Sequence, residues 1–238
     1  MKNLLLTCFI IFISGCQTAS NKQLSTMQQQ LDKMQDVQTQ IAIKVGLGEL
    51  VRPDVIELSK DGVWVGSQSA DIVIMEFTDL HCPYCKKFHN EVWPLVKEKY
   101  VDTNQVAILA REFPLASLHP KAPYAAVMLR CANQQGEYEA VKNDLFSLGN
   151  TLSKDSITQI TSDYDLDETQ FNACLKDTDV HNKVTESLKD AAALGLSSTP
   201  TFIIGRKVDN AITDYQIIKG AASLSQFSKI IDSFSSSK

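Results

Sequence analysis

The sequence predicts an α/β fold in which a helical insertion separates the third and fourth core strands and an N-terminal helix precedes the domain. Apolar runs of strand length occur near both ends of residues 48–238. Between them, residues 117–194 carry no strand pattern and repeat apolar residues at helical spacing. Residues 16–47 are polar and Gln-rich, with apolar residues three and four positions apart. Together these patterns predict a small sheet interrupted by a block of helices.

Individual elements follow from local pattern. The run 71–77 is apolar along most of its length, as a strand buried on both faces of a sheet requires. A helix is expected at 82–100 and a closing helix at 223–234. The first of these is expected to turn four apolar residues toward the core, namely Phe88, Val92, Leu95 and Val96. The expected strands are 62–66 at an edge, 71–77, 106–113, 201–204 and 215–218.

The first residues have the pattern of an export signal. Lys2 is followed by an apolar stretch, 4–13, that is too short to span a bilayer comfortably. Residues 13–16 read Ile-Ser-Gly-Cys and resemble a bacterial lipobox, which predicts removal of residues 1–15 and lipidation of Cys16. An ordinary signal peptide or an uncleaved anchor are the alternatives. Gln17, rather than Asp, after this cysteine favours the outer membrane, so we expect a lipid-anchored protein of the periplasm.

The periplasm is oxidising, which affects how the other cysteines are interpreted. Cys8 leaves with the signal peptide, and Cys131 and Cys174 remain as an even pair outside the Cys-x-x-Cys motif. We expect them to form a structural disulfide, with two separate buried thiols as the alternative. Asp165 or Asp167 is expected to cap the helix that carries Cys174.

The stretch His81-Cys82-Pro83-Tyr84-Cys85 directly follows the expected central strand. Pro83 suits the first position of a helix, because its missing N–H would have no partner there. Cys82 is then at the helix N-terminus, where the unpaired amides stabilise a thiolate. A stabilised thiolate is a good leaving group, so the motif predicts thiol–disulfide exchange between Cys82 and Cys85.

Two metal-based alternatives use the same residues. Cys82, Cys85 and His89, with His81 adjacent, could bind zinc, but a second Cys-x-x-Cys is lacking and Pro83 stiffens the loop. Covalent haem attachment needs His directly after the second cysteine, where this chain has Lys86. We therefore expect neither a metal nor a cofactor.

The N-terminal helix carries a heptad pattern. Its apolar residues are Leu24, Met27, Leu31, Met34, Ile41 and Val45, and Gln38 takes the position that would continue the repeat. The pattern predicts a homo-oligomer formed through residues 24–45, or else an amphipathic surface helix or a spacer from the membrane. The net charge of −5, with no basic block, argues against a nucleic-acid partner.

Motifs along the chain resemble one family when they are taken together. Residues 50–236 are similar to the DsbA-like periplasmic thiol–disulfide oxidoreductases, which have a thioredoxin fold with a helical insertion. The motifs that carry the resemblance are Glu76-Phe77 before Cys82-Pro83-Tyr84-Cys85, Arg111-Glu112-Phe113-Pro114-Leu115 before His119-Pro120, Arg130-Cys131-Ala132 with Gln135-Gly136, and Ser198-Thr199-Pro200-Thr201-Phe202.

This resemblance implies roles for single residues. Cys82 is the exposed, attacking cysteine, and Cys85 is the buried partner that resolves the mixed disulfide. Glu76 lies beneath the cysteines and relays a proton to or from Cys85; a charged acid in an apolar strand otherwise needs a partner. Thr199 and Pro200 form a cis-proline loop that pairs with a substrate strand.

The resemblance leaves the direction of electron flow open. The family often has His where this chain has Tyr84, and Pro83-Tyr84 resembles glutaredoxins and the DsbG branch. Thr199 matches the DsbC and DsbG branches, while His81 could supply cationic support for the thiolate. One interpretation is an oxidase of exported proteins with a DsbB-like membrane partner. Another is an isomerase or reductase with a DsbD-like partner, and a third is an envelope lipoprotein that binds proteins without redox turnover.

Overall fold

A computed structural model describes the backbone of residues 2–235 and the side chains of residues 21–48 and 50–235. The chain divides into two compact units, Met1–Arg52 and Pro53–Lys238, and we describe each by itself. The proposed boundaries after residues 15 and 47 remain predictions.

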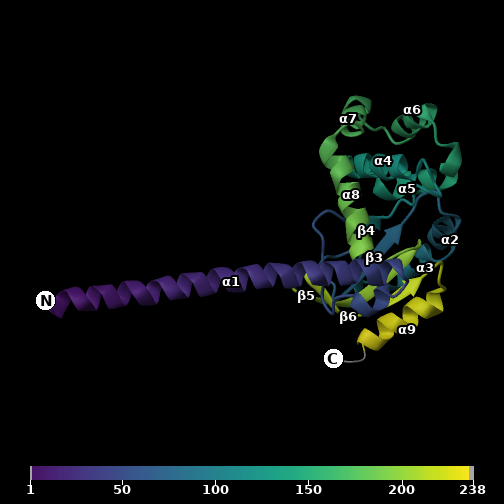
Figure 1. Cartoon of the computed structure of the whole chain (residues 1–238). Helices are drawn as coiled ribbons and strands as arrows, with labels where there is room; N and C mark the ends of the chain where they lie inside the picture. The colour runs from purple at the N-terminus through teal and green to yellow at the C-terminus, as the bar shows by residue number, and fades with distance from the viewer. Residues whose placement is uncertain (1, 236–238) are drawn as a thin grey trace. The chain divides into compact units, whose positions relative to one another are not determined.

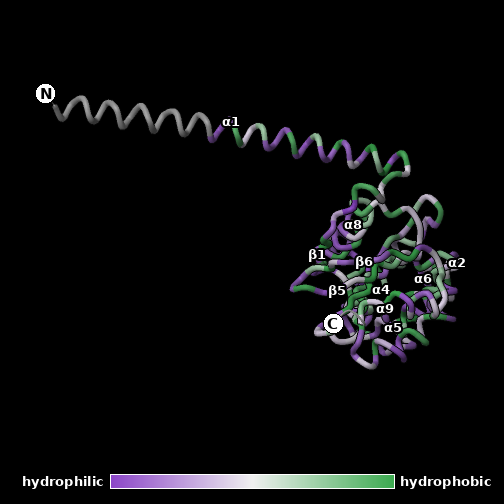
Figure 2. The backbone as a smooth tube through the Cα atoms, turned by 90° about the horizontal axis from the view of Figure 1, so that it is seen from below, coloured by the Kyte–Doolittle hydropathy of each residue, from purple (hydrophilic) through white to green (hydrophobic). Residues whose placement is uncertain are grey.

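The N-terminal unit consists of one long helix and a short turn of 3-10 helix. Helix α1 spans Lys2–Lys44, and η1 spans Gly48–Val51. Gly46 adopts a φ of 81°, a left-handed conformation that glycine accepts without strain just after a helix. Polar and apolar residues interchange along the described part of α1 (Figure 2). The side chains of residues 1–20, and with them the predicted signal peptide and Cys16, lie outside the described residues.

The predicted heptad positions of α1 carry exposed apolar side chains. The exposed fractions of Leu24, Met27, Leu31, Met34, Ile41 and Val45 lie between 53% and 67%. Among the residues with described side chains, no helix has the length and apolar character needed to cross a membrane.

The second unit is built on a six-stranded mixed sheet in the order β1-β6-β5-β3-β4-β2 (Figure 1). Strands β3 and β4 are parallel, and the other neighbouring pairs are antiparallel. All seven residues of β3 are buried, which fits its apolar sequence and its position between two neighbours. The strands are β1 (Ile56–Glu57), β2 (Val63–Val65), β3 (Ile72–Thr78), β4 (Val106–Glu112), β5 (Thr201–Val208) and β6 (Ala211–Lys219).

Helices cover both faces of this sheet. Successive residues of β3 point to opposite faces, so Ile72 and Ile74 join one apolar cluster and Val73 and Met75 join the other. In Figure 1, α4–α7 gather into one block and α8 runs from it back toward the sheet. The helices are α2 (Pro83–Glu91), α3 (Trp93–Val96), the π-helical turn η2 (Lys97–Val101), α4 (Ala122–Gln134), α5 (Tyr138–Leu148), the 3-10 turn η3 (Gly149–Thr151), α6 (Lys154–Asp163), α7 (Glu168–Cys174), α8 (Thr178–Ala193) and α9 (Leu224–Ser235).

The fold class predicted from the sequence is confirmed, since the helices α4–α8 separate β4 from β5. The segment at 62–66 is an edge strand as predicted, because β2 pairs only with β4. Asp167 caps α7, its carboxylate accepting a hydrogen bond from the amide of Gln170 at 2.8 Å. Cys131 of α4 and Cys174 of α7 form a disulfide, which ties two helices of the insertion together.

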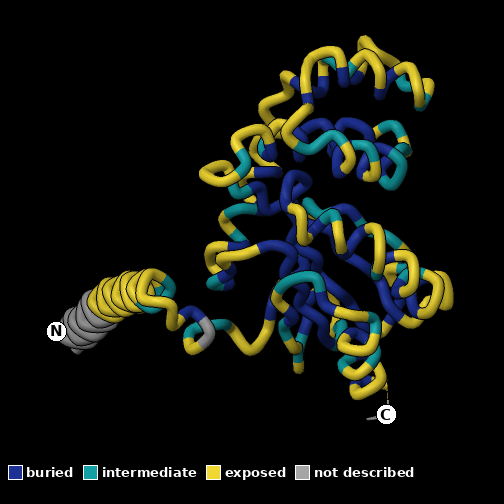
Figure 3. The backbone as a smooth tube through the Cα atoms, turned by 90° about the vertical axis from the view of Figure 1, so that its right-hand side faces the viewer, coloured by how far each residue is buried: buried dark blue, intermediate teal, exposed yellow. Residues whose placement is uncertain are grey.

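The prediction of one continuous helix over 82–100 was wrong. The segment is divided into α2, α3 and η2, and Pro94 lies at the start of α3, where it needs no N–H partner. Phe88 and Val96 are buried and Val92 packs partly buried against the core, as predicted, whereas Leu95 is 46% exposed and does not face the core. Buried segments lie in the middle of the domain, and the exposed segments lie at its surface (Figure 3).

Candidate active site

The Cys-x-x-Cys motif lies at the junction of β3 and α2. Cys82 has extended backbone angles and is the N-cap of α2, Pro83 occupies the first helical position, and Cys85 follows within the first turn. Phe88 then packs its ring 4.4 Å from that of Phe202 on β5, which fixes α2 against the sheet. This arrangement is the one that the sequence pattern predicts.

Both thiols are buried, although they differ in degree. Cys82 is 6% exposed and Cys85 is 1% exposed, so Cys82 is not the openly exposed cysteine that the resemblance implies. Pro83 and Tyr84, between them, are both exposed to solvent, and the exposed fraction of Tyr84 is 64%.

The environment separates the two thiol pKa values. A hydrogen bond with the Cys85 side chain outweighs burial and, with Thr199 and the amides of Cys85 and Tyr84, lowers the pKa of Cys82 to about 5. Burial, followed by the neighbouring Cys82, raises the pKa of Cys85 well above that of an ordinary thiol. At neutral pH the reduced pair therefore holds a thiolate at Cys82 and a thiol at Cys85.

A second loop lies against Cys82. The Thr199–Pro200 peptide bond is cis, and the Thr199 carbonyl oxygen is 3.4 Å from Cys82 Sγ. The loop is anchored on both sides of the proline, because Thr201 donates its hydroxyl to the carbonyl of Ser198 and Pro200 accepts from the amide of Gly220. This places the predicted loop beside the first cysteine.

Glu76 is buried on the face of β3 that the insertion covers. Its carboxylate accepts from Lys142 Nζ of α5 at 3.0 Å, and the side chains are 5% and 3% exposed. Burial alone would lower the pKa of Lys142. The neighbouring acidic groups, Glu76 foremost, outweigh this effect and raise the pKa of the lysine. Sequence reasoning found the acid but missed Lys142, because a lysine on an amphipathic helix gives no signal of burial.

His89 lies near the same ion pair. Its Nε2 is 2.5 Å from Asn143 Oδ1, and its ring packs on Phe146. Burial lowers the pKa of His89, and the charge of Lys142 lowers it further. The ring that the zinc alternative needs is thus hydrogen-bonded to the insertion. Among the described side chains, no group of three His, Cys, Asp or Glu residues is placed to hold a metal ion.

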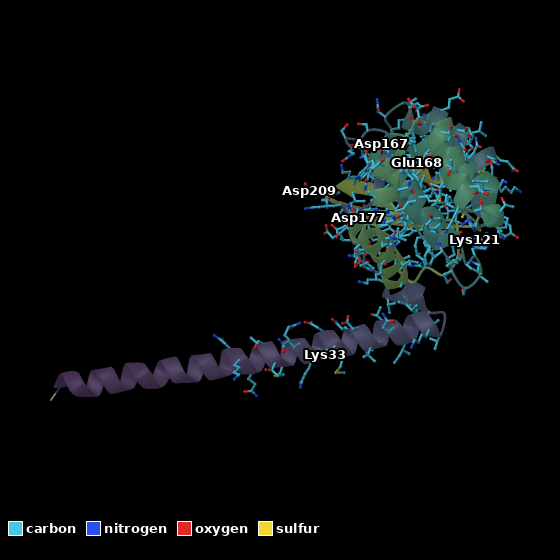
Figure 4. The ribbon with its side chains drawn as sticks, turned by 90° about the horizontal axis from the view of Figure 1, so that it is seen from above. Lys33, Lys121, Asp167, Glu168, Asp177 and Asp209 are labelled. Carbon is cyan, nitrogen blue, oxygen red and sulfur yellow. A yellow bond between two sulfur atoms is a disulfide. The ribbon has the colours of Figure 1, made fainter. Side chains whose placement is uncertain are left out.

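His81 is also buried. Burial lowers its pKa, which favours the neutral ring over the imidazolium that we expected as support for the thiolate. The charge of Asp79 and the side chain of Asn150 oppose the effect of burial on this pKa, whereas the charges of His119 and Lys121 lower it further. Lys121, labelled in Figure 4, donates its ammonium to the carbonyl groups of Asn150 and Leu152.

Asp79 is a functional candidate that sequence reasoning missed. It is 1% exposed, and its carboxylate accepts from the amides of His81 and Leu115, each at 2.8 Å. The same carboxylate is 2.9 Å from His119 Nδ1. An acid directly before a redox motif was the available signal, but its partners are 36 and 40 positions away along the chain.

Comparison with known proteins agrees with this geometry. A family model described as thioredoxin matches residues 58–233, and the chain belongs to this family. Within it, the chain is DsbA-like. The crystal structure of Wolbachia pipientis α-DsbA1 is 26% identical and superposes with a TM-score of 0.65, covering 78% of this chain and 94% of that one. A thioredoxin-like oxidoreductase from Silicibacter pomeroyi is 25% identical, with a TM-score of 0.59 and coverage of 76% and 95%.

Curated relatives match over part of their length. The Na(+)/H(+) antiporter NhaA 3 of Salinispora tropica is 29% identical, over 60% of this chain and 21% of the antiporter. A provisionally named protein-disulfide oxidoreductase of Rickettsia bellii is 24% identical, over 68% of this chain and 57% of that protein. The chain thus spans less than two thirds of each of these relatives.

Proposed function

We propose that this protein is a protein thiol–disulfide oxidoreductase of the periplasm, acting on exported proteins through the Cys82–Cys85 pair. The observation that carries the proposal is the thiolate at Cys82, whose pKa is lowered to about 5, directly beside the Thr199 carbonyl group. A sulfur that is a good leaving group, next to the backbone of the cis-proline loop, suits disulfide exchange with an extended substrate.

The reaction proceeds in two exchange steps. A substrate thiolate attacks Cys82 Sγ, the Cys82–Cys85 bond breaks, and Cys85 leaves as a thiolate that takes up a proton. A second substrate thiolate then attacks the substrate sulfur of the mixed disulfide and releases Cys82 as a thiolate. The substrate loses two electrons and gains a disulfide, and the Cys82–Cys85 pair gains the same two electrons.

The direction we favour is oxidation of substrates. A thiolate stabilised at Cys82 stabilises the reduced form, and a stable reduced form makes the disulfide a stronger oxidant. A DsbB-like membrane protein would then regenerate the disulfide. The alternative is an isomerase or reductase kept reduced by a DsbD-like protein, which Tyr84, Thr199 and an oligomeric state would suit.

We further propose that the protein is held at the outer membrane by a lipid on Cys16, after removal of residues 1–15. Residues 16–47 would then link the anchor to the domain formed by residues 48–238, and the exposed apolar residues of α1 would join copies of the chain. Lipid labelling of the wild type and of Cys16→Ala tests the anchor. Equal labelling of both proteins would rule it out.

One experiment tests the redox function. A reduced, unfolded substrate with several cysteines is incubated with the oxidised wild type and with Cys82→Ser, Cys85→Ser and the double variant. We expect disulfide formation with the wild type alone. Cys85→Ser should form a trapped mixed disulfide only when the substrate already contains disulfides, because its Cys82 thiolate then attacks a substrate disulfide and releases a substrate thiolate. If the double variant supports client folding as well as the wild type does, the third interpretation, a binding lipoprotein, is correct instead. Equilibration with glutathione then distinguishes an oxidase from a reductase.

A further inference from the structure

We propose that Asp79 is a positioning residue for Cys85, and that His119 holds Asp79 in place for this task. The inference rests on the proposed function, because it concerns the sulfur that leaves and returns during exchange. The two residues lie outside the Cys-x-x-Cys motif, and His119 follows β4, on a different segment of the chain from the cysteines.

The backbone of Asp79 contacts both halves of the motif. Its amide N–H donates toward Cys85 Sγ at 3.5 Å, and its carbonyl oxygen accepts from the amide of Cys82 at 3.0 Å. The amide of Asp79 is among the groups that favour the Cys85 thiolate against the effect of burial. A small change in the backbone at Asp79 would therefore alter the surroundings of the buried sulfur.

The side chain of Asp79 keeps this part of the backbone in place. Its two carboxylate oxygens accept three hydrogen bonds, from the amides of His81 and Leu115 and from His119 Nδ1. A carboxylate can only accept, so Nδ1 of His119 is the donor. The bond to His81 closes a local turn, while the bonds to Leu115 and His119 join the turn to the segment after β4. A buried carboxylate with this many donors is rigidly placed.

Rigid placement matters because charge appears at Cys85 during exchange. When a substrate thiolate attacks Cys82 Sγ, the disulfide breaks and the electron pair passes to Cys85 Sγ, which carries a negative charge until it gains a proton. In the reverse step, Cys85 loses that proton, attacks Cys82 Sγ of the mixed disulfide and expels the substrate thiolate. A fixed N–H donor aimed at the sulfur stabilises the charged state in both directions.

His119 offers a matched pair of substitutions. Its side chain is 16% exposed, so replacement disturbs the core less than replacement of Asp79. His119→Ala removes the donor to the carboxylate, whereas His119→Asn keeps an N–H donor at nearly the same distance from the backbone. Asp79→Asn changes the carboxylate directly but disturbs the site more, because one carboxylate oxygen is replaced by an NH₂ group that faces other hydrogen-bond donors.

The control is Asp190→Asn. Asp190 lies on α8 and forms an ion pair with the fully buried Arg111, away from Asp79 and the Cys82–Cys85 motif. Its substitution lowers global stability without changing Asp79, and so shows what loss of stability alone does to the exchange kinetics.

The experiment uses the full chain with glutathione bound to Cys82 as a mixed disulfide. The rate at which Cys85 expels glutathione is followed by acid quench and mass spectrometry, and the equilibrium constant of the pair with glutathione is measured alongside. We expect His119→Ala to slow this step about tenfold, on the scale of a hydrogen bond to a charged group, and to shift the equilibrium constant. His119→Asn should restore most of the rate, and Asp190→Asn should match the wild type.

Three other outcomes contradict different claims. If the wild type exchanges normally and His119→Ala expels glutathione at the wild-type rate, the positioning role is wrong while the redox function stands. If all variants, including Asp190→Asn, slow in proportion to their loss of stability, the contact is merely structural. If the wild type itself forms no Cys82–Cys85 disulfide, the failure lies with the proposed function.

Discussion

Lys142 Nζ lies 3.0 Å from the Glu76 carboxylate, although the two residues are 66 positions apart in the sequence. The contact joins the helical insertion to the central strand at a point where both side chains are buried. Removing two charges from water is costly, and their attraction repays the cost only while both are present. The pair therefore couples the placement of the insertion to the strand that leads into the cysteines.

Breaking this pair from one side should destabilise the fold. We expect Lys142→Met to lower the free energy of unfolding by about 3–5 kcal/mol, because it leaves the Glu76 charge buried without a partner. Glu76→Gln together with Lys142→Met should recover much of the loss. Urea denaturation of the single and double variants measures both. The explanation would be contradicted if the double variant lost more unfolding free energy than the two single variants lose together.

The same pair predicts how stability responds to alkaline pH. The folded-state pKa of Lys142 is raised above its unfolded value. Its contribution to stability is therefore fully present below the unfolded pKa and is lost as the pH rises through the folded value. The loss of stability at alkaline pH should be smaller in the doubly substituted chain than in the wild type, as denaturation at several pH values can establish.

Alkylation of the reduced protein should report the Cys82 thiolate. We expect the rate with iodoacetamide to rise with a midpoint near pH 5, since the pKa of Cys82 is lowered to about 5. The largest cause is the hydrogen bond from Cys85, so Cys85→Ala should move the midpoint upward. Cys85→Ser keeps a hydroxyl donor and should move it less. Identical midpoints in the two variants would remove Cys85 as the cause.

Stability of the reduced form should depend on pH through this thiolate. A lowered folded pKa contributes stability that is fully present above the unfolded thiol pKa of about 8.5 and is lost as the pH falls through about 5. As the pH rises from about 5 to about 8.5, the unfolding free energy of the reduced protein should therefore increase relative to that of the oxidised protein. Guanidinium denaturation of both forms at a series of pH values checks the slope.

The disulfide of the insertion should act on stability rather than on exchange. Cys131 and Cys174 are 43 positions apart, and closing a loop of that length stabilises a fold by about 4 kcal/mol in the chain-entropy model. We expect Cys131→Ala with Cys174→Ala to lose stability on this scale while the equilibrium of Cys82 and Cys85 with glutathione is retained. A shift in that equilibrium would show that the insertion tunes the redox pair.

The apolar face of α1 can be tested by charge substitution. Leu31 and Met34 are 53% and 61% exposed, and they lie at adjacent seam positions of the heptad pattern. If copies of the chain associate through this face, Leu31→Lys with Met34→Lys should reduce the mass measured by light scattering. Gln29→Lys, outside the seam, is the matched control and should leave it unchanged. A wild type that is monomeric at all concentrations would exclude the association.

Sequence patterns predicted the elements that depend mainly on residues close together in the chain. The apolar run of β3 indicated a buried central strand. Pro83 indicated the start of α2, because a residue without an N–H suits the first position of a helix. Strand β1 has only two residues and depends on pairing with β6, so no local pattern could indicate it. Leu95 was misplaced because the buried side of its segment carries His89, Trp93 and Tyr100, and two of these are polar or partly polar residues that an apolar pattern does not count.

The candidate site divides in the same way. Cys82, Cys85 and the Thr199-Pro200 loop carry motifs that the sequence displays directly. Lys142 and His119 act through contacts made only when distant segments meet, and neither residue type is unusual where it occurs. Electrostatic partners of this kind follow from the fold and cannot be recovered from spacing alone.

The structure describes two cysteine pairs, and burial does not distinguish them. Cys131 and Cys174 are 1% and 6% exposed, as buried as Cys85 and Cys82, but they join two helices of the insertion, whereas Cys82 is the N-cap of α2 with the Thr199 carbonyl oxygen 3.4 Å from its Sγ. A protein that exchanges disulfides must leave its own structural disulfide intact, including when it meets other copies of itself. Among the cysteines whose side chains are described, one pair is thus placed for exchange, and the other holds two helices of the insertion together.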